Sequence, residues 1–117
     1  MTEQIANPGT SVKRKFPRYP ADLRLDVTVF RDGQNVTLWG RSSEISLDGV
    51  GGTLTRSLEP GEVVWLVVNL PNPLCGIKLR ALVRYRDGLR HGFEFLARDA
   101  KQREALEHFC GQLVSNR

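Results

Sequence analysis

The chain lacks several features that define large classes of protein. Its 117 residues include two cysteines, Cys75 and Cys110, which lie far apart and show no metal-binding spacing. A disulfide framework and a zinc site are therefore not expected, and both thiols should be reduced. No apolar run approaches the ~20 residues that a membrane-spanning helix needs. Met1 to Ser11 has no signal-peptide pattern, so we expect a cytoplasmic location and no membrane insertion.

Residues arranged for catalysis are also scarce. The two histidines, His91 and His108, belong to no nucleophile or metal-binding motif. Glu44 and Asp48 form a carboxylate pair, but nothing nearby suits them to acid–base catalysis. We therefore expect a binding protein rather than an enzyme, with no metal and no cofactor.

Alternating apolar residues predict a protein built mainly of β-strands. Between residues 23 and 96, six segments have strand character and are separated by turn pairs such as Asp32-Gly33 and Asp87-Gly88. Glu62 to Leu70 is nearly continuously apolar, which predicts a strand covered on both faces. Trp39 and Trp65 fall within predicted strands, and we expect both to pack.

A single helix is predicted after the last strand. Asp99 and Gln102 have the spacing of a capping box, and the following apolar residues recur with helical periodicity. Cys110 falls on the apolar side and is expected to be a core thiol. Short strands followed by one helix indicate an all-β domain, a small closed or nearly closed barrel with a C-terminal helix.

The first segment with binding potential is basic and precedes the strands. Lys13, Arg14, Lys15 and Arg18 place four positive charges within six residues, with no acid among them. Pro17 and Pro20 favour extended backbone there, so this segment is expected to be a flexible loop. Such a cluster suits a phosphate-bearing ligand, a nucleic acid or an anionic membrane, but it is also compatible with a solvated tail.

The second segment lies at the end of the second predicted strand. Glu44 offers a carboxylate that can accept hydrogen bonds from the N1–H and N2–H₂ groups of guanine, and Ser46 adds a hydroxyl. Gly49 permits close approach of the backbone to a ligand. Arginine pairs with phosphate and guanine and stacks on bases, so the two segments together predict one pocket for an anionic, purine-bearing small molecule.

In these two motifs the chain resembles the PilZ domain family. Arg14 and Arg18 match the family's RxxxR motif, and Ser46 and Gly49 match its [D/N]xSxxG motif. The resemblance covers about residues 13–114 and implies a six-stranded antiparallel barrel with a C-terminal helix. It also suggests the domain limits: a flexible tail at 1–12 and one domain at 13–117, with the barrel at about 21–97 and the helix at about 99–114.

The resemblance further implies that the chain binds the bacterial second messenger cyclic di-GMP. Six of the implied contacts are Arg14, Arg18, Glu44, Ser46, Gly49 and Arg84, the last by stacking on a base. Lys13 adds charge that favours an intercalated ligand dimer. Binding is expected to order the segment at about 9–20 and so create a surface for an effector protein, which the sequence does not identify.

Glu44 departs from the family pattern, which has Asp or Asn at this position. The extra methylene would cost about 1 to 3 kcal/mol if the hydrogen bond to the ligand were lost. The alternative is therefore a PilZ-like adaptor that does not bind the nucleotide and acts by protein–protein contact. A nucleic acid polymer is not expected, because no aromatic platform is evident beside the basic loop.

Overall fold

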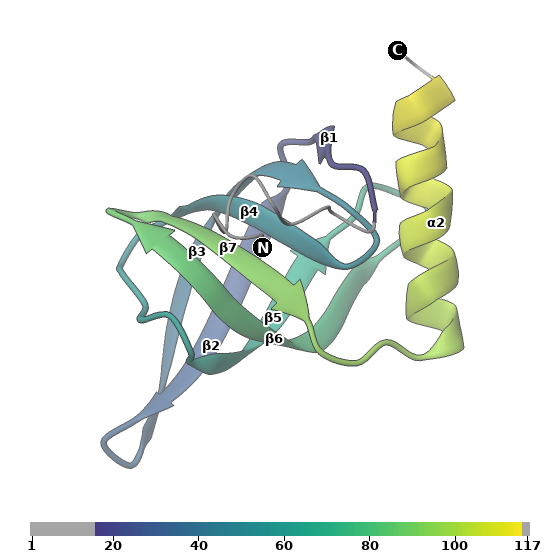
Figure 1. The fold of residues 1–117 in the computed structure, drawn as a ribbon. Coiled ribbons are helices and arrows are strands. Elements are labelled where there is room, and N and C mark those ends of the chain that lie inside the picture. Colours follow the sequence, from purple (N-terminus) through teal and green to yellow (C-terminus); the bar gives the residue numbers. More distant parts are fainter. Residues whose placement is uncertain (1–15, 116–117) are drawn as a thin grey trace, which may run out of the picture.

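The structure, a computed structural model, describes residues 16–115 and forms a closed β-barrel with a flanking helix (Figure 1). Within these residues seven antiparallel strands follow the order β1–β3–β2–β5–β6–β7–β4, and an additional pairing of β3 with β4 closes the barrel. The elements are β1 (Tyr19–Pro20), β2 (Arg24–Arg31), β3 (Gln34–Ile45), β4 (Gly49–Leu54), β5 (Val63–Asn69), β6 (Gly76–Asp87), β7 (Arg90–Phe95) and α2 (Ala100–Ser115). The expected six-stranded barrel and terminal helix are confirmed. The two-residue β1, which pairs with β3, was not anticipated.

The turn between β2 and β3 follows directly from its sequence. Asp32 and Gly33 have φ angles of 50° and 79°, the left-handed backbone that a tight hairpin needs at both central positions. This turn sets the register in which Arg31 pairs with Gln34 and Arg24 pairs with Arg41. The predicted hairpin is therefore confirmed.

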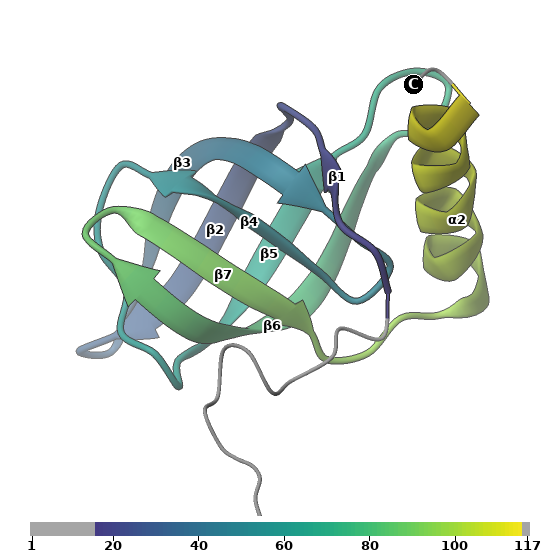
Figure 2. The ribbon, with the colours of Figure 1, turned by 45° about the horizontal axis from the view of Figure 1, so that its top comes forward.

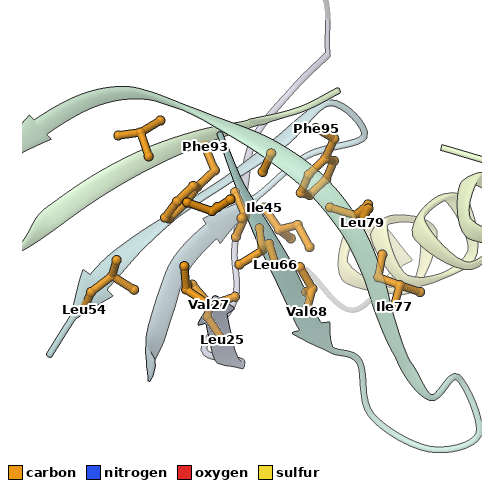
Figure 3. Packing of buried hydrophobic residues seen from close by; sticks show 14 of the residues in the cluster. Leu25, Val27, Ile45, Leu54, Leu66, Val68, Ile77, Leu79, Phe93 and Phe95 are labelled. Atoms are coloured by element: carbon orange, nitrogen blue, oxygen red, sulfur yellow. The ribbon is translucent and has the colours of Figure 1, made fainter. Parts of the chain in front are cut away.

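The barrel interior is filled by the apolar side chains of alternating strand residues (Figure 3). Leu25, Leu66 and Phe93 come from three different strands and are at most 2% exposed. Burying a side chain of this size stabilises the fold by about 1.5 to 3 kcal/mol. The core consists of a single apolar cluster that also includes Leu106 and Phe109 of α2.

A β-bulge near the end of β3 reverses which residues of this strand face the core. Leu38 and Ser42 point inward, but the register against β4 shifts between Ser42 and Glu44. Ile45 is consequently fully buried, whereas Glu44 is turned to the outside. Without the extra residue, simple alternation would bury the carboxylate of Glu44. The bulge therefore makes Glu44 available at the surface.

The strand β5 differs from expectation because only one of its faces is covered. Its burial alternates strictly, with Val64, Leu66 and Val68 inward and Trp65 outward at 44% exposure. The prediction of a strand covered on both sides is thus wrong. Closure of a small barrel leaves every strand with one solvent face, and the helix lies beside one end of the barrel instead of over β5 (Figure 1).

The helix α2 begins with the predicted capping box. The Gln102 amide donates to Asp99 Oδ1 at 2.8 Å, and the Asp99 amide donates to Gln102 Oε1 at 3.1 Å. Cys110 is buried as expected, and this burial raises the pKa of its thiol to about 11. Among the described residues, the helix is too polar and too short to span a membrane.

His91 is a fully buried polar residue on the inner face of β7. Its Nε2 accepts a hydrogen bond from the Leu58 amide at 2.9 Å, and its Nδ1 lies 2.8 Å from the Leu89 carbonyl oxygen. This pattern fits a neutral ring that donates from Nδ1. Burial lowers the pKa of His91 below its ordinary value of 6.5, despite the hydrogen bond to Leu89.

We therefore expect the free energy of unfolding to decrease as the pH falls below 6.5. Over that range the unfolded chain binds a proton that the folded chain excludes, which costs up to about 1.4 kcal/mol per pH unit until the lowered pKa is reached. Urea unfolding between neutral and mildly acidic pH measures this loss. In His91→Gln, whose amide can still accept from Leu58 but does not titrate, the slope should flatten; an unchanged slope would contradict the assignment.

Candidate functional site

The two segments singled out in the sequence meet at the outer surface of the barrel. Arg18 Nη1 donates to Glu44 Oε2 at 2.8 Å, although 26 residues separate them in the chain. Both side chains are largely covered, at 22% and 32% exposure. The pairing of Pro20 with Glu44 in the short β1–β3 ladder holds the Arg18 segment against the end of β3. Lys13 and Arg14 lie outside the described residues.

Arg18 is not fully satisfied by this ion pair. Its Nε is buried and has no hydrogen-bond partner within residues 16–115. A buried donor without an acceptor costs about 1 to 3 kcal/mol, more when it is charged. An anionic acceptor reaching Arg18 would therefore be stabilised by a donor that is already desolvated.

Ser46 shapes the turn between β3 and β4. It is fully buried, and its hydroxyl lies 2.5 Å from Asp48 Oδ1, to which it donates, and 3.2 Å from the Asp48 amide, from which it accepts. The Ser46 amide also donates to the Gly49 carbonyl oxygen at 2.9 Å. In this arrangement Ser46 positions the backbone of Gly49. A direct contact with a ligand would require its hydroxyl to leave the turn.

A row of paired residues crosses four strands beside this turn. Glu44 pairs with Gly51 of β4, Gly51 pairs with Gly92 of β7, and Gly92 pairs with Tyr85 of β6. We call these four residues the glycine row. A Cβ on Gly51 would lie 3.4 Å from Glu44 Cγ, and one on Gly92 would collide with the Tyr85 ring. The side chains of Glu44 and Tyr85 thus lie over the two glycines from opposite ends.

Arg84 lies next to this row at a second bulge. The register between β6 and β7 shifts between Val83 and Tyr85, so that Arg84 and Tyr85 are both exposed. Arg84 Nη1 lies 3.3 Å from Glu94 Oε1, and its side chain is 63% exposed. Glu94 pairs with Gly49, which connects Arg84 to the turn of Ser46. The expected solvent-exposed position of the Arg84 side chain is confirmed.

The described part of the site therefore presents two guanidinium groups, each beside a carboxylate, and two buried glycines, Gly51 and Gly92, that the side chains of Glu44 and Tyr85 cover. This arrangement suits a ligand with negative charge and flat rings, because arginine can bind its anionic groups and stack on its rings. Within residues 16–115 no group of three His, Cys, Asp or Glu side chains could hold a metal ion.

Tyr85 and Gly92 were not singled out from the sequence. Strict alternation in β6 would place Tyr85 on the inner face with Val83, and only the bulge turns it outward. The available signal was the turn pair Asp87-Gly88, which indicated a hairpin and not a bulge. Sequence reasoning therefore found the edges of the site but not the residues between them.

Comparison with known proteins supports both the fold and the family. A family model described as the PilZ domain matches residues 12–112. A search of curated proteins found no match. The solved PilZ domain with c-di-GMP of YcgR from Escherichia coli superposes with a TM-score of 0.74 at 19% identity, covering 90% of this chain and 94% of that chain.

Two further structures are similar over most of this chain. Bacillus subtilis inhibitor of motility (MotI/DgrA) has a TM-score of 0.72 and 21% identity, covering 96% of this chain and 58% of that one. The K. pneumonia MrkH–c-di-GMP complex has a TM-score of 0.70 and 14% identity, covering 90% of this chain and 53% of that one. These similarities establish the barrel-and-helix fold.

Proposed function

Since the chain belongs to the PilZ domain family, we propose that it is a cyclic di-GMP receptor that signals by binding, through the two motifs that its fold brings together. The family consists of receptors and adaptors, so the chain is a binding domain rather than an enzyme, as expected. The proposed ligand site comprises Lys13, Arg14, Arg18, Glu44, Ser46, Gly49 and Arg84.

The observation that carries this proposal is the contact between Arg18 and Glu44. It joins the RxxxR segment to the ExSxxG segment at a distance of 2.8 Å. A solvated basic tail would not require such a contact. It would also not require a largely covered arginine whose Nε has no hydrogen-bond partner among residues 16–115. The contact therefore favours a common ligand site over two unrelated surface segments.

Each described residue of the proposed site is assigned a role. Arg18 binds phosphate or the guanine edge, using the Nε that has no described partner. Glu44 accepts from guanine and Ser46 holds the turn. Gly49 keeps this turn close to β7, where a Cβ would collide with the Phe93 carbonyl oxygen. Arg84 is exposed enough to stack on a base.

The proposed signal is an ordering of the chain before the barrel. Of the segment at about 9–20, Tyr19 and Pro20 already pair with β3 and Arg18 already contacts Glu44. Binding would therefore order the preceding residues, from about residue 9, against the barrel and change the surface offered to an effector protein. Lys13 would add positive charge and favour an intercalated ligand dimer. The tail at 1–12, the single domain at 13–117 and a cytoplasmic location belong to the same proposal.

Titration calorimetry with cyclic di-GMP tests this function. The full chain should bind with micromolar or tighter affinity, and Arg18→Ala should weaken binding at least about a hundredfold because two charge-assisted contacts are lost. Arg14→Ala should have a comparable effect. Arg103→Ala, on the exposed side of α2, serves as the control and should bind like the unmodified chain.

The second candidate function is that of an adaptor that does not bind the nucleotide. It is favoured by one observation, the ion pair in which Glu44 already occupies Arg18. A ligand must compete with this carboxylate for the guanidinium. An absence of heat at high protein concentration, with the barrel intact by circular dichroism, would favour the adaptor and rule out the receptor.

A further inference from the structure

A second surface with binding character lies on the opposite side of the barrel. The glycine row lies on β4, β7 and the adjoining ends of β3 and β6, whereas β2 and β5 form the far wall (Figure 2). Trp39 of β3 and Trp65 of β5 face outward on either side of β2, each 44% exposed. The expectation that these tryptophans pack into the protein is therefore wrong.

Cationic side chains accompany both indole rings. Arg24 Cζ lies 4.7 Å from the centroid of the Trp39 ring. Arg80 Cζ and Lys78 Nζ lie 5.1 and 5.2 Å from the centroid of the Trp65 ring. Such cation–π contacts hold the long side chains against the rings and keep their charges at the surface. We call Arg24, Trp39, Val63, Trp65, Lys78 and Arg80 the tryptophan face.

The charge of this face is largely uncompensated. Asp26 already bonds to Arg24 and to the Asn69 amide. Lys78 and Arg80 take part in no ion pair within the described residues. An exposed aliphatic residue, Val63 at 40%, adjoins Trp65. The face is therefore both basic and apolar, and it shares no residue with the proposed ligand site.

We propose that the tryptophan face binds a partner protein through a segment that carries carboxylates among apolar side chains. Tryptophan and arginine are enriched among the residues that contribute most to protein interfaces. Lys78 and Arg80 supply the charges that acidic side chains would complement, and the indole rings with Val63 supply apolar area. The inference does not depend on cyclic di-GMP, because the two surfaces lie on opposite walls.

A single-stranded nucleic acid fits these observations less well. Bases need open aromatic faces on which to stack, but a guanidinium or ammonium group already lies over each indole ring. An aliphatic side chain such as Val63 has no charge and no hydrogen-bond donor with which to bind a phosphate backbone. An acidic protein segment can use the cations and the aliphatic surface together.

The test uses peptides selected on the full chain from a random phage-displayed library. We expect the selected sequences to be rich in Asp and Glu with interspersed apolar residues. Because Trp39 and Trp65 are the only two tryptophans in the chain, binding at this face should shift the intrinsic emission to shorter wavelength. Cyclic di-GMP binding on the other wall provides no such direct contact.

Two matched charge reversals locate the bound peptide. Lys78→Glu combined with Arg80→Glu should weaken peptide binding at least about tenfold. Arg56→Glu combined with Arg90→Glu changes the net charge equally at exposed positions after β4 and on β7, and should alter binding by less than about twofold. Equal losses in both variants would contradict the proposal.

Three other results would also overturn it. The first is a selection that yields no acidic sequence able to shift the tryptophan emission. An oligouridylate that binds and displaces the peptides would assign the face to single-stranded nucleic acid. Emission of the chain alone that changes with protein concentration, together with a dimer in sedimentation, would assign the face to self-association.

Discussion

Replacement of Gly51 by leucine is expected to abolish cyclic di-GMP binding while the barrel remains folded. Gly51 lies in the middle of the glycine row, paired with Glu44 on one side and Gly92 on the other. Its Cβ position is 3.4 Å from Glu44 Cγ and Glu44 Oε2, so a larger side chain would displace that carboxylate from Arg18. We expect at least about a hundredfold loss of affinity by calorimetry, because the ligand loses Glu44 and meets a leucine side chain in its place.

The control for this prediction is the stability of the same variant. A Cβ on Gly51 meets a flexible side chain and no backbone atom closer than the His91 carbonyl oxygen at 3.6 Å. The midpoint of urea unfolding should therefore change little. Retained binding in a folded Gly51→Leu chain would move the ligand site away from the glycine row and contradict the proposed geometry.

Replacement of the next residue, Gly52, by alanine is expected to destabilise the barrel by at least about 3 kcal/mol, a large part of the stability of a small domain. A Cβ there would point into the barrel wall, collide with the Arg41 carbonyl oxygen and lie 2.8 Å from the Ser42 Cα. These are backbone atoms of β3 and cannot rotate away. To relieve these clashes, β3 and β4 would have to separate beside the bulge, and this would break the strand pairing that closes the barrel.

Urea unfolding of Gly52→Ala measures this effect, and Gly51→Ala is its matched control. The two variants add the same methyl group to neighbouring residues of one strand, on opposite faces. Only Gly52→Ala, whose added methyl group points inward, should lose stability. If both variants unfold at the same urea concentration, the close approach of β3 and β4 at Gly52 is not present in solution.

Much of the fold was predictable because it depends on local pattern. The alternation in Leu25, Val27 and Val29 places these residues in the core regardless of which strands lie beside them. Asp32 and Gly33 specify their turn, and Asp99 and Gln102 specify where the helix begins. The candidate site was predictable at its edges for a similar reason, since its two motifs are short and contiguous.

The remaining features depend on long-range pairing. Two bulges turn Glu44 and Tyr85 outward, and neither is visible in a sequence that is read as strict alternation. The extra methylene of Glu44 looked only like a weakness in the sequence, but the structure shows that this side chain reaches Arg18. Trp65 reads as a core residue in an apolar run, yet it faces solvent.

The sequence by itself determined the strand and helix segments, the turns and the two charged motifs, because backbone preference and side-chain chemistry are properties of neighbouring residues. Only the tertiary structure decided that the barrel closes through β3 and β4, that Arg18 meets Glu44 across 26 residues, and that two tryptophans lie on the opposite wall. These outcomes depend on which strands pair and in which register, and that choice is made by the packing of the whole core.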